Sequence, residues 1–161
     1  MEIIDNFLDI DNAKSVFKYC FTSSYTYGET DDPKLNHPPT GMIHHINSDE
    51  SIYNLFESKI RDACDSVKGM DLYRMYVNCF APSENPYFHI DGDGLTFLYY
   101  LTNHDWRADD GGETQFLIDD DTIKGVLPIS NRLVSFDGNI WHRATPFRYN
   151  HRFTLAAKFR K

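Results

Sequence analysis

Two amphipathic helices are predicted in the first 70 residues, where apolar positions recur at helical spacing. The first runs from Asp11, which can cap its N-terminus, to about Phe21. The second begins at Ser48 and ends at Lys68-Gly69. The apolar faces are formed by Ala13, Val16, Phe17 and Cys20 in the first helix, and by Ile52, Leu55, Phe56, Ile60, Ala63 and Val67 in the second.

The segment between the helices has the composition of a loop. Residues Ser23–Asn47 are rich in Thr, Pro, Gly and Asp, and a loop of this length is typical of a functional lid. The adjacent His44 and His45 lie in it. Adjacent residues rarely face the same ion, so we interpret these histidines as loop-packing or surface groups. A short strand and turn are predicted over Glu2–Leu8.

From Leu72 onward the helical period fades, and short runs of strand-forming residues are separated by Gly, Asn, Asp and Pro. About eight strands at this spacing predict a mainly β sandwich or barrel, with the two helices buttressing one face. We expect one domain over residues 1–161, with helical support and a loop in 1–70 and the β core in 71–161. The predicted strands are Leu72–Phe80, Tyr87–Ile90, Leu95–Leu101, Glu113–Ile118, Thr122–Leu127, Arg132–Phe136, Trp141–Pro146 and Arg152–Phe159.

Composition narrows the class of protein. The net charge of −8 argues against a nucleic-acid-binding surface, which needs clustered Lys and Arg. No apolar run reaches membrane length, and the N-terminus lacks a basic-then-apolar signal. The three cysteines form no paired framework, so we expect buried free thiols and a reducing compartment. These features predict a cytoplasmic protein with no nucleic-acid or membrane partner. They do not indicate its oligomeric state.

A candidate metal site begins at His89-Ile90-Asp91. The triplet alone carries little weight, because 7 His and 18 Asp in this chain give about 0.8 His-x-Asp triplets by random placement. Its setting carries more. On a strand, His89 and Asp91 would point to the same face while Ile90 points away. Gly92 and Gly94 then permit a tight turn beside the metal.

His142 is the best candidate for the third ligand, because it alone among its rivals is followed ten residues later by an arginine, Arg152. Neighbouring antiparallel strands would bring both to one cavity wall, and Thr154 would share the face of Arg152. Two imidazoles and a carboxylate suit non-haem iron(II), whereas zinc more often recruits cysteine or a third histidine. The guanidinium can grip a carboxylate in bidentate fashion.

The charges of such a site would balance. Iron(II), the Asp91 carboxylate, a 2-oxoglutarate dianion and the Arg152 guanidinium sum to about zero, as a buried cavity requires. The set predicts an enzyme that uses iron, O2 and 2-oxoglutarate. The alternative is that His89 and Asp91 form a cross-strand hydrogen-bonded pair and that Arg152 is a surface charge. Taken jointly on a predicted barrel, these residues favour the metal site.

The chain resembles the prolyl 4-hydroxylase branch of the iron(II)/2-oxoglutarate-dependent dioxygenases over about Leu72–Lys161. This resemblance implies a double-stranded β-helix (a jelly-roll, cupin-like fold) and ascorbate as a supporting reductant. It implies His89, Asp91 and His142 as metal ligands. The motifs that carry it are His89-Ile90-Asp91, Phe97-Leu98-Tyr99-Tyr100-Leu101-Thr102-Asn103-His104-Asp105-Trp106, Gly111-Gly112-Glu113-Thr114-Gln115-Phe116, Trp141-His142-Arg143 and Arg152-Phe153-Thr154.

The resemblance also implies that Arg152 holds the C5 carboxylate of 2-oxoglutarate and that the hydroxyl of Tyr100 assists. We predict that Thr154 donates a hydroxyl to the same carboxylate. The predicted catalytic set is then the three metal ligands with Arg152. One departure is Phe80, where the family often has a tyrosine, so this ring cannot donate a hydrogen bond.

The predicted substrate is a prolyl residue in a peptide or protein. A small molecule such as a free amino acid is the alternative within the same chemistry, and a non-catalytic metal-binding β-barrel module is the alternative outside it. Nucleic-acid demethylation is a weaker option because of the acidic charge balance. The loops Ser23–Asn47 and Asp105–Asp110 are candidates for closing over the substrate.

Overall fold

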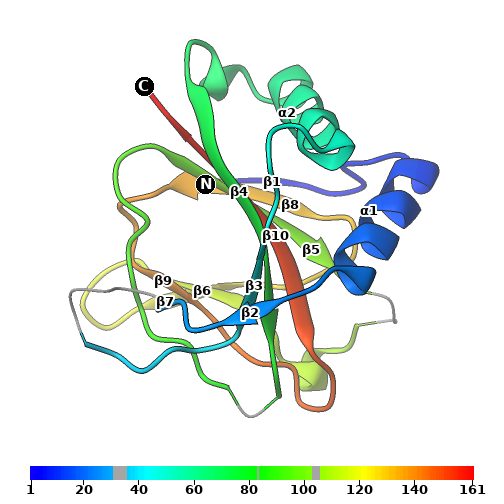
Figure 1. Ribbon diagram of the computed structural model, residues 1–161. Helices are drawn as coiled ribbons and strands as arrows, with labels where there is room; N and C mark the ends of the chain where they lie inside the picture. Colours follow the sequence, from blue (N-terminus) through cyan, green and yellow to red (C-terminus); the bar gives the residue numbers. More distant parts are fainter. Residues whose placement is uncertain (31–35, 83, 103–105) are drawn as a thin grey trace.

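The protein folds around two antiparallel β-sheets, shown in a computed structural model (Figure 1) that describes residues 1–30, 36–82, 84–102 and 106–161. The larger sheet has the order β1-β8-β5-β10-β4-β3-β2 and the smaller one β7-β6-β9. The strands are β1 Glu2–Ile4, β2 Thr26–Tyr27, β3 Met42–His45, β4 Asp71–Phe80, β5 Leu95–Leu101, β6 Thr114–Leu117, β7 Ile123–Val126, β8 Leu133–Asp137, β9 His142–Ala144 and β10 Arg152–Arg160.

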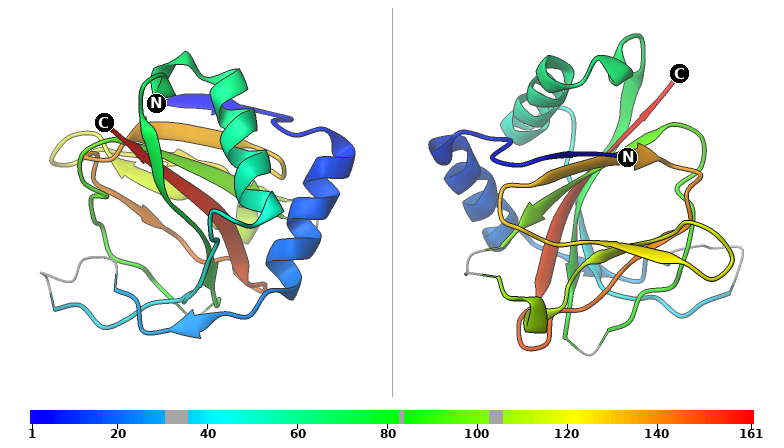
Figure 2. Two further views of the ribbon diagram at one scale, coloured as in Figure 1. Left: turned by 45° about the horizontal axis from the view of Figure 1, so that its top comes forward. Right: turned by 180° about the vertical axis from the view of Figure 1, so that it is seen from behind.

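Two α-helices cover one face of the larger sheet, and the smaller sheet faces the other (Figure 2). They are α1 (Ile10–Thr22) and α2 (Ser51–Ala63). Single 3-10 turns, η1 (Asp65–Val67) and η2 (Ala108–Asp110), occur in the connections. Within the described residues, neither helix has the length and apolar character needed to cross a bilayer. The expected mainly β architecture with buttressing helices is confirmed.

Strand periodicity divides the interior into two clusters. On β10, Leu155 and Ala157 pack toward the helices, where Phe56 is fully buried. Ala156 points to the opposite side and packs between the sheets with Phe116. Because alternate residues share a face, Arg152, Thr154 and Lys158 lie on the same side of β10 as Ala156.

The helix boundaries differ from the sequence prediction. Asp9, not Asp11, caps α1, since its carboxylate accepts a hydrogen bond of 3.0 Å from the Asn12 amide. Helix α2 is preceded by Glu50 rather than by a Ser48 cap, and Glu50 makes no side-chain cap. The helix ends at Ala63 and not at Lys68-Gly69. The intervening residues form η1, which buries Val67 in the helix-facing core.

Two strand predictions also need correction. The segment Ser23–Asn47 contains β2 and β3, which extend the larger sheet beside β4. Conversely, Tyr87–Ile90 is not a strand, because only an isolated bridge at His89 is formed there. The other predicted strands are confirmed within one or two residues. The three cysteines are buried and free, as expected.

Candidate active site

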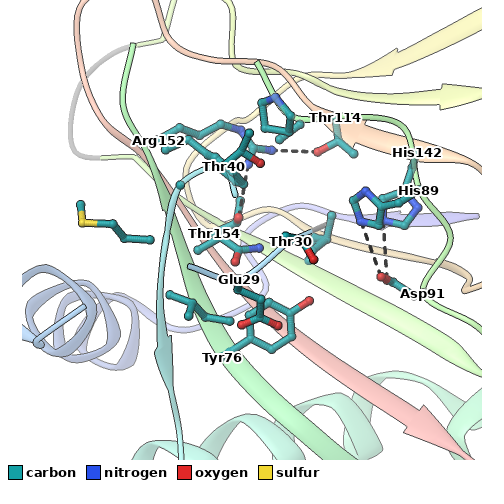
Figure 3. Close-up of a pocket in the computed structure, with 18 of the residues that line it drawn as sticks. Glu29, Thr30, Thr40, Tyr76, His89, Asp91, Thr114, His142, Arg152 and Thr154 are labelled. Carbon is teal, nitrogen blue, oxygen red and sulfur yellow. Dashed lines mark hydrogen bonds and ion pairs between the residues drawn. The ribbon is translucent and has the colours of Figure 1, made fainter. Parts of the chain in front are cut away.

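Three potential metal ligands converge on one point of the cavity between the two sheets (Figure 3). The ligand atoms of His89, Asp91 and His142 all lie within 4.8 Å of one another. The Asp91 carboxylate is 3.7 Å from Nε2 of His89 and 3.6 Å from Nε2 of His142. Among the described residues, no other group of His, Cys, Asp and Glu is arranged to hold a metal in this way.

The backbone brings the two histidines together although only one belongs to a strand. His89 and His142 exchange two backbone hydrogen bonds, of 3.0 and 2.9 Å, and their ring centroids are 4.5 Å apart. Nδ1 of His89 lies 3.0 Å from the Tyr87 carbonyl, and Nδ1 of His142 lies 2.8 Å from the Ile140 carbonyl. Because a carbonyl only accepts, Nδ1 donates in each ring, so Nε2 is the ring nitrogen that can bind a metal.

His142 is held in the neutral form that a metal requires. Burial lowers the pKa of its imidazole to about 4, although the Asp91 carboxylate opposes this shift. The side chain is neutral near pH 7 and can offer its Nε2 lone pair to a divalent cation without first losing a proton. The tautomers and the protonation state therefore fit a metal site.

Asp91 is fixed by both its backbone and its side chain. Its amide donates to the Gly138 carbonyl at 2.7 Å. Its carboxylate accepts hydrogen bonds from Thr96 Oγ1 at 2.6 Å and from Lys158 Nζ at 2.7 Å. Burial would raise the pKa of Asp91, but His142, Lys158 and these hydrogen bonds together lower it. The carboxylate is therefore charged and oriented before any metal binds.

Arg152 is a buried cation without an acidic partner among the described residues. It is 2% exposed. Nε donates to the Gly112 carbonyl at 2.8 Å, Nη2 to Thr114 Oγ1 at 2.9 Å and Nη1 to Thr154 Oγ1 at 3.3 Å. Burial lowers the pKa of Arg152, but a guanidinium stays charged in proteins. A buried charge of this kind requires a counter-ion, so the site fits one carboxylate of a diacid.

The triad and Arg152 line the same cavity, which also includes Thr114 and Thr154. Tyr100 reaches this end of the cavity indirectly, because its hydroxyl donates to Thr114 Oγ1 at 2.7 Å. The cavity thus has a place for a divalent cation and, beside it, a cationic end with hydroxyl groups. The residues present fit iron(II) together with a 2-oxoglutarate dianion.

The other positions that the sequence drew attention to differ in where they lie. His44 contacts Tyr19 Oη and the Ser24 carbonyl at 2.9 Å each, so it packs within the fold. His151 is exposed, and His104 lies outside the described residues. Trp141, which precedes the predicted ligand His142, is 42% exposed. Phe80 lines the cavity and is paired with Arg152 across β4 and β10.

Several cavity residues were not predicted. Lys158 carries a sequence signal, since it lies two and three strand periods beyond Thr154 and Arg152 and must share their face. Glu29 and Arg74 form an ion pair at the cavity wall. No spacing pattern connects two residues so far apart in the chain. Only the pairing of β2 with β3, and of β3 with β4, brings them together.

Comparison with known proteins agrees with this geometry. The model of the 2OG-Fe(II) oxygenase superfamily matches residues 75–160, which is more than half of the chain and contains all four predicted catalytic residues. No curated protein sequence matches the chain.

Solved structures share the fold at low sequence identity. A prolyl hydroxylase from Trichoplax adhaerens, in complex with a hypoxia inducible factor peptide fragment, is 21% identical over 98% of this chain and 82% of its own, with a TM-score of 0.76. A Pseudomonas putida prolyl-4-hydroxylase is 18% identical over 99% of this chain and 91% of its own, with a TM-score of 0.78. HygX from Streptomyces hygroscopicus, with nickel, 2-oxoglutarate and hygromycin B bound, is 11% identical over 98% of this chain and 81% of its own, with a TM-score of 0.73.

These likenesses confirm the expected double-stranded β-helix. The fold, the converging triad and the family match lead to one assignment. The chain belongs to the 2OG-Fe(II) oxygenase superfamily and is an iron(II)- and 2-oxoglutarate-dependent dioxygenase.

Proposed function

We propose that the protein hydroxylates a prolyl residue in a peptide or protein, with His89, Asp91 and His142 holding iron(II) and Arg152 holding 2-oxoglutarate. One observation carries the proposal: a cluster of two histidines and one carboxylate lines the same cavity as a buried guanidinium that has no acidic partner among the described residues. The fold itself does not require the metal-ligand cluster and the buried guanidinium to occur together. Together they match a metal and a diacid bound side by side.

When bound, iron(II) would supply the oxidant that inserts one atom of O2 into a C–H bond while 2-oxoglutarate becomes succinate and carbon dioxide. The protein supplies orientation. Nδ1 of each histidine donates to a backbone carbonyl, which fixes the ring, and Thr96 and Lys158 hold the Asp91 carboxylate. Such hydrogen bonds set the ligand geometry before metal arrives.

The diacid end is built to bind one carboxylate. Thr114 Oγ1 accepts from both Tyr100 and Arg152, so its own hydroxyl proton is available for a ligand. Thr154 Oγ1 accepts from Arg152 and is likewise able to donate. The guanidinium and the two hydroxyls would therefore grip the C5 carboxylate and direct the opposite end of 2-oxoglutarate toward the triad.

The wall formed by the segment Ser23–Asn47 supports its predicted role in closing over the substrate. Described residues of this segment line the cavity, among them Glu29, Thr40 and Gly41. The described residues of the second predicted loop, 106–110, do not line it, and Asp105 lies outside the described part. We therefore propose the first segment as the substrate-facing wall that excludes water.

The substrate class rests on similarity. The Trichoplax adhaerens prolyl hydroxylase was solved with a peptide fragment, which supports a peptide substrate here. HygX was solved with hygromycin B, which supports a small molecule as the second candidate. We also propose ascorbate as supporting reductant, from the family resemblance, and the cytoplasm as the location, from the three unpaired cysteines.

The test is succinate formation. Protein supplied with iron(II), 2-oxoglutarate and ascorbate should form succinate faster when proline-rich peptides are added, and mass spectrometry should detect a gain of one oxygen on a prolyl residue. His142→Ala should abolish succinate formation. His151→Ala, which removes an exposed histidine, is the matched control. Succinate formation at the wild-type rate by His142→Ala would exclude the proposed metal site.

If free proline stimulates turnover and peptides do not, the small-molecule candidate replaces the peptide. A protein that binds manganese(II) but never forms succinate would be a non-catalytic metal-binding module.

A further inference from the structure

Two cations stand side by side at the end of the cavity away from Arg152. Lys158 on β10 and Arg74 on β4 are directly paired in the antiparallel register, and both line the cavity. Like charges at paired positions destabilise a sheet unless other groups compensate them. Negatively charged groups are therefore needed at this end of the cavity to neutralise the two adjacent cations.

Each cation has a carboxylate, but the described residues satisfy Arg74 only in part. Lys158 Nζ donates to Asp91 Oδ1 at 2.7 Å. Arg74 donates to Glu29 through Nη2 alone, and no described residue accepts a hydrogen bond from its Nε or Nη1. The guanidinium carbon is 4.4 Å from the centre of the Tyr76 ring, which holds the group in place. A planar fork with unused donors is suited to a second carboxylate.

The net charge of the cavity also favours a negatively charged substrate. Among the described lining residues, Arg74, Arg152 and Lys158 are cations and Glu29 and Asp91 are carboxylates, so these five side chains carry one net positive charge. Iron(II) and a 2-oxoglutarate dianion cancel each other. The loaded cavity would keep one positive charge within a protein of net charge −8. A substrate with a single negative charge would complete the balance.

A route from the surface leads to these cations. A second hollow is lined by Gly28 and Ile90 and shares Glu29, Arg74 and Lys158 with the cavity. The Glu29–Arg74 ion pair thus lies where the hollow and the cavity meet. In Figure 3, Glu29 and Tyr76 are drawn below Arg152 and Thr154.

We propose that the substrate bears a carboxylate that binds to Arg74 and Lys158, and that Glu29 occupies this position until substrate arrives. The inference rests on the proposed function and adds a substrate class to it. The carboxylate belongs either to a free amino acid, as its α-carboxylate, or to a peptide, as an acidic side chain next to the target prolyl residue. Both sources present the same chemistry to Arg74.

Two matched pairs of probes separate the sources. One pair is L-proline and L-prolinamide. The other is an acetylated, amidated prolyl peptide with Glu after the proline and the same peptide with Gln. The carboxylate member of one pair should be preferred by about tenfold or more in kcat/KM, as expected for a charge-assisted hydrogen bond. The pair that shows the preference identifies the source.

Variants assign the preference to the cation pair. Arg74→Gln should bring the ratio within each pair close to one, and Arg74→Lys should restore part of it. Arg160→Gln is the matched control, because Arg160 also lies 4.4 Å over a tyrosine ring, that of Tyr73, but does not line the cavity. Glu29→Gln should raise kcat/KM for the carboxylate member, since its internal competitor is weakened.

Binding must be measured apart from turnover. Isothermal titration calorimetry of each probe against protein loaded with manganese(II) and 2-oxoglutarate should show the same preference. Equal binding of both members of each pair by the wild-type protein would overturn the inference, even if succinate is formed. So would an Arg74→Gln variant that raises the KM for 2-oxoglutarate and keeps the substrate preference. Absence of succinate with a retained binding preference would instead refute the proposed function alone.

Discussion

Arg152 has more hydrogen-bond donors than the described residues accept. A guanidinium offers five N–H groups, and three hydrogen bonds to Gly112, Thr114 and Thr154 are formed. The side chain is fully enclosed, so bulk water cannot take the remaining donors. An anion must complete the site for the burial of this charge to be tolerated. This is why one residue, rather than the cavity as a whole, indicates a diacid.

Tyr100→Phe tests whether the support behind Arg152 matters. Removing the Tyr100 hydroxyl deletes its 2.7 Å hydrogen bond to Thr114. The Thr114 hydroxyl, which faces the diacid, is then held less firmly. We expect the KM for 2-oxoglutarate to rise roughly fivefold, the equivalent of about one hydrogen bond, with little change in kcat at saturation. Initial rates of succinate formation over a 2-oxoglutarate titration measure both constants.

Tyr99→Phe is the control for this prediction. Tyr99 lies on the other face of β5, and its hydroxyl donates to Asn131 at 3.0 Å. Its loss should cost about 1 kcal/mol of stability and leave the KM for 2-oxoglutarate unchanged. If the two variants have the same KM, Tyr100 has no part in binding the diacid.

At the scale of residues, the sequence predicts the site residues that are separated by a characteristic number of positions along the chain. His89 and Asp91 are two apart, and His142 precedes Arg152 by ten residues. The positions of Glu29 and Arg74 depend on how β3 pairs with β4, which no local pattern states. Lys158 was overlooked although strand periodicity places it beside Thr154. A lysine on an inward-facing position is a signal that could have been used.

At the scale of elements, Asp91 is held by a turn instead of a strand. The amides of Asp91 and Gly92 both donate to the Gly138 carbonyl, at 2.7 and 3.2 Å. The contact is too close for a side chain, since a Cβ at Gly138 would lie 2.3 Å from the Gly92 carbonyl oxygen. The turn after β8 and the segment after His89 therefore form one unit that aims the carboxylate.

Gly138→Ala should weaken metal binding without removing a ligand. The added methyl group would force the Gly92 backbone away and displace Asp91 from the two imidazoles. We expect manganese(II) to bind at least about tenfold more weakly, as for changes in groups that orient ligands. Calorimetric titration of the metal-free protein measures this. Gly125→Ala is the control, since its nearest contact is the flexible Glu113 side chain at 3.3 Å; equal affinities of the two variants would contradict the account.

The N-terminal cap of α1 in the structure differs from the cap that the sequence predicts. Asp9 accepts the Asn12 amide, whereas the predicted cap Asp11 lies inside the first turn. Asp9→Ala should lower the urea midpoint of unfolding because the cap is lost, and Asp11→Ala should lower it less because Asp11 acts only through the helix dipole. Urea denaturation followed by circular dichroism compares them. A larger loss in Asp11→Ala would restore the sequence assignment.

The predicted boundaries of elements are wrong where tertiary contacts override the local sequence pattern. Val67 continues the apolar spacing of α2, but the chain tightens into η1 to bury it after the helix has ended at Ala63. The strands β2 and β3 lie in a segment whose composition is that of a loop, and they form because β4 offers an edge. Strands that are buried at nearly every position, such as β5 and β10, were placed within a residue.

At the scale of the molecule, one face of the larger sheet provides stability and the other face carries the cavity. The helices pack against one face of the larger sheet and bury the apolar positions of β4, β5 and β10. The polar and charged positions of the same strands are left on the opposite face, where the smaller sheet encloses the cavity. The apolar layer behind the sheet offsets the cost of burying the Arg152 guanidinium in front, which the diacid is expected to neutralise.

Ligand binding should therefore stabilise the whole fold. Manganese(II) with 2-oxoglutarate at about 100 times the dissociation constant should add about 2.7 kcal/mol, or roughly 5–10 °C in Tm for a chain of this size. Calorimetric scans with and without EDTA measure the shift. 2-Oxoglutarate alone should give a smaller shift, because Arg152 gains its counter-ion while the triad stays empty. The wild-type shift in His142→Ala would mean that the metal binds elsewhere, and no shift in the wild-type protein would remove the energetic case for the site.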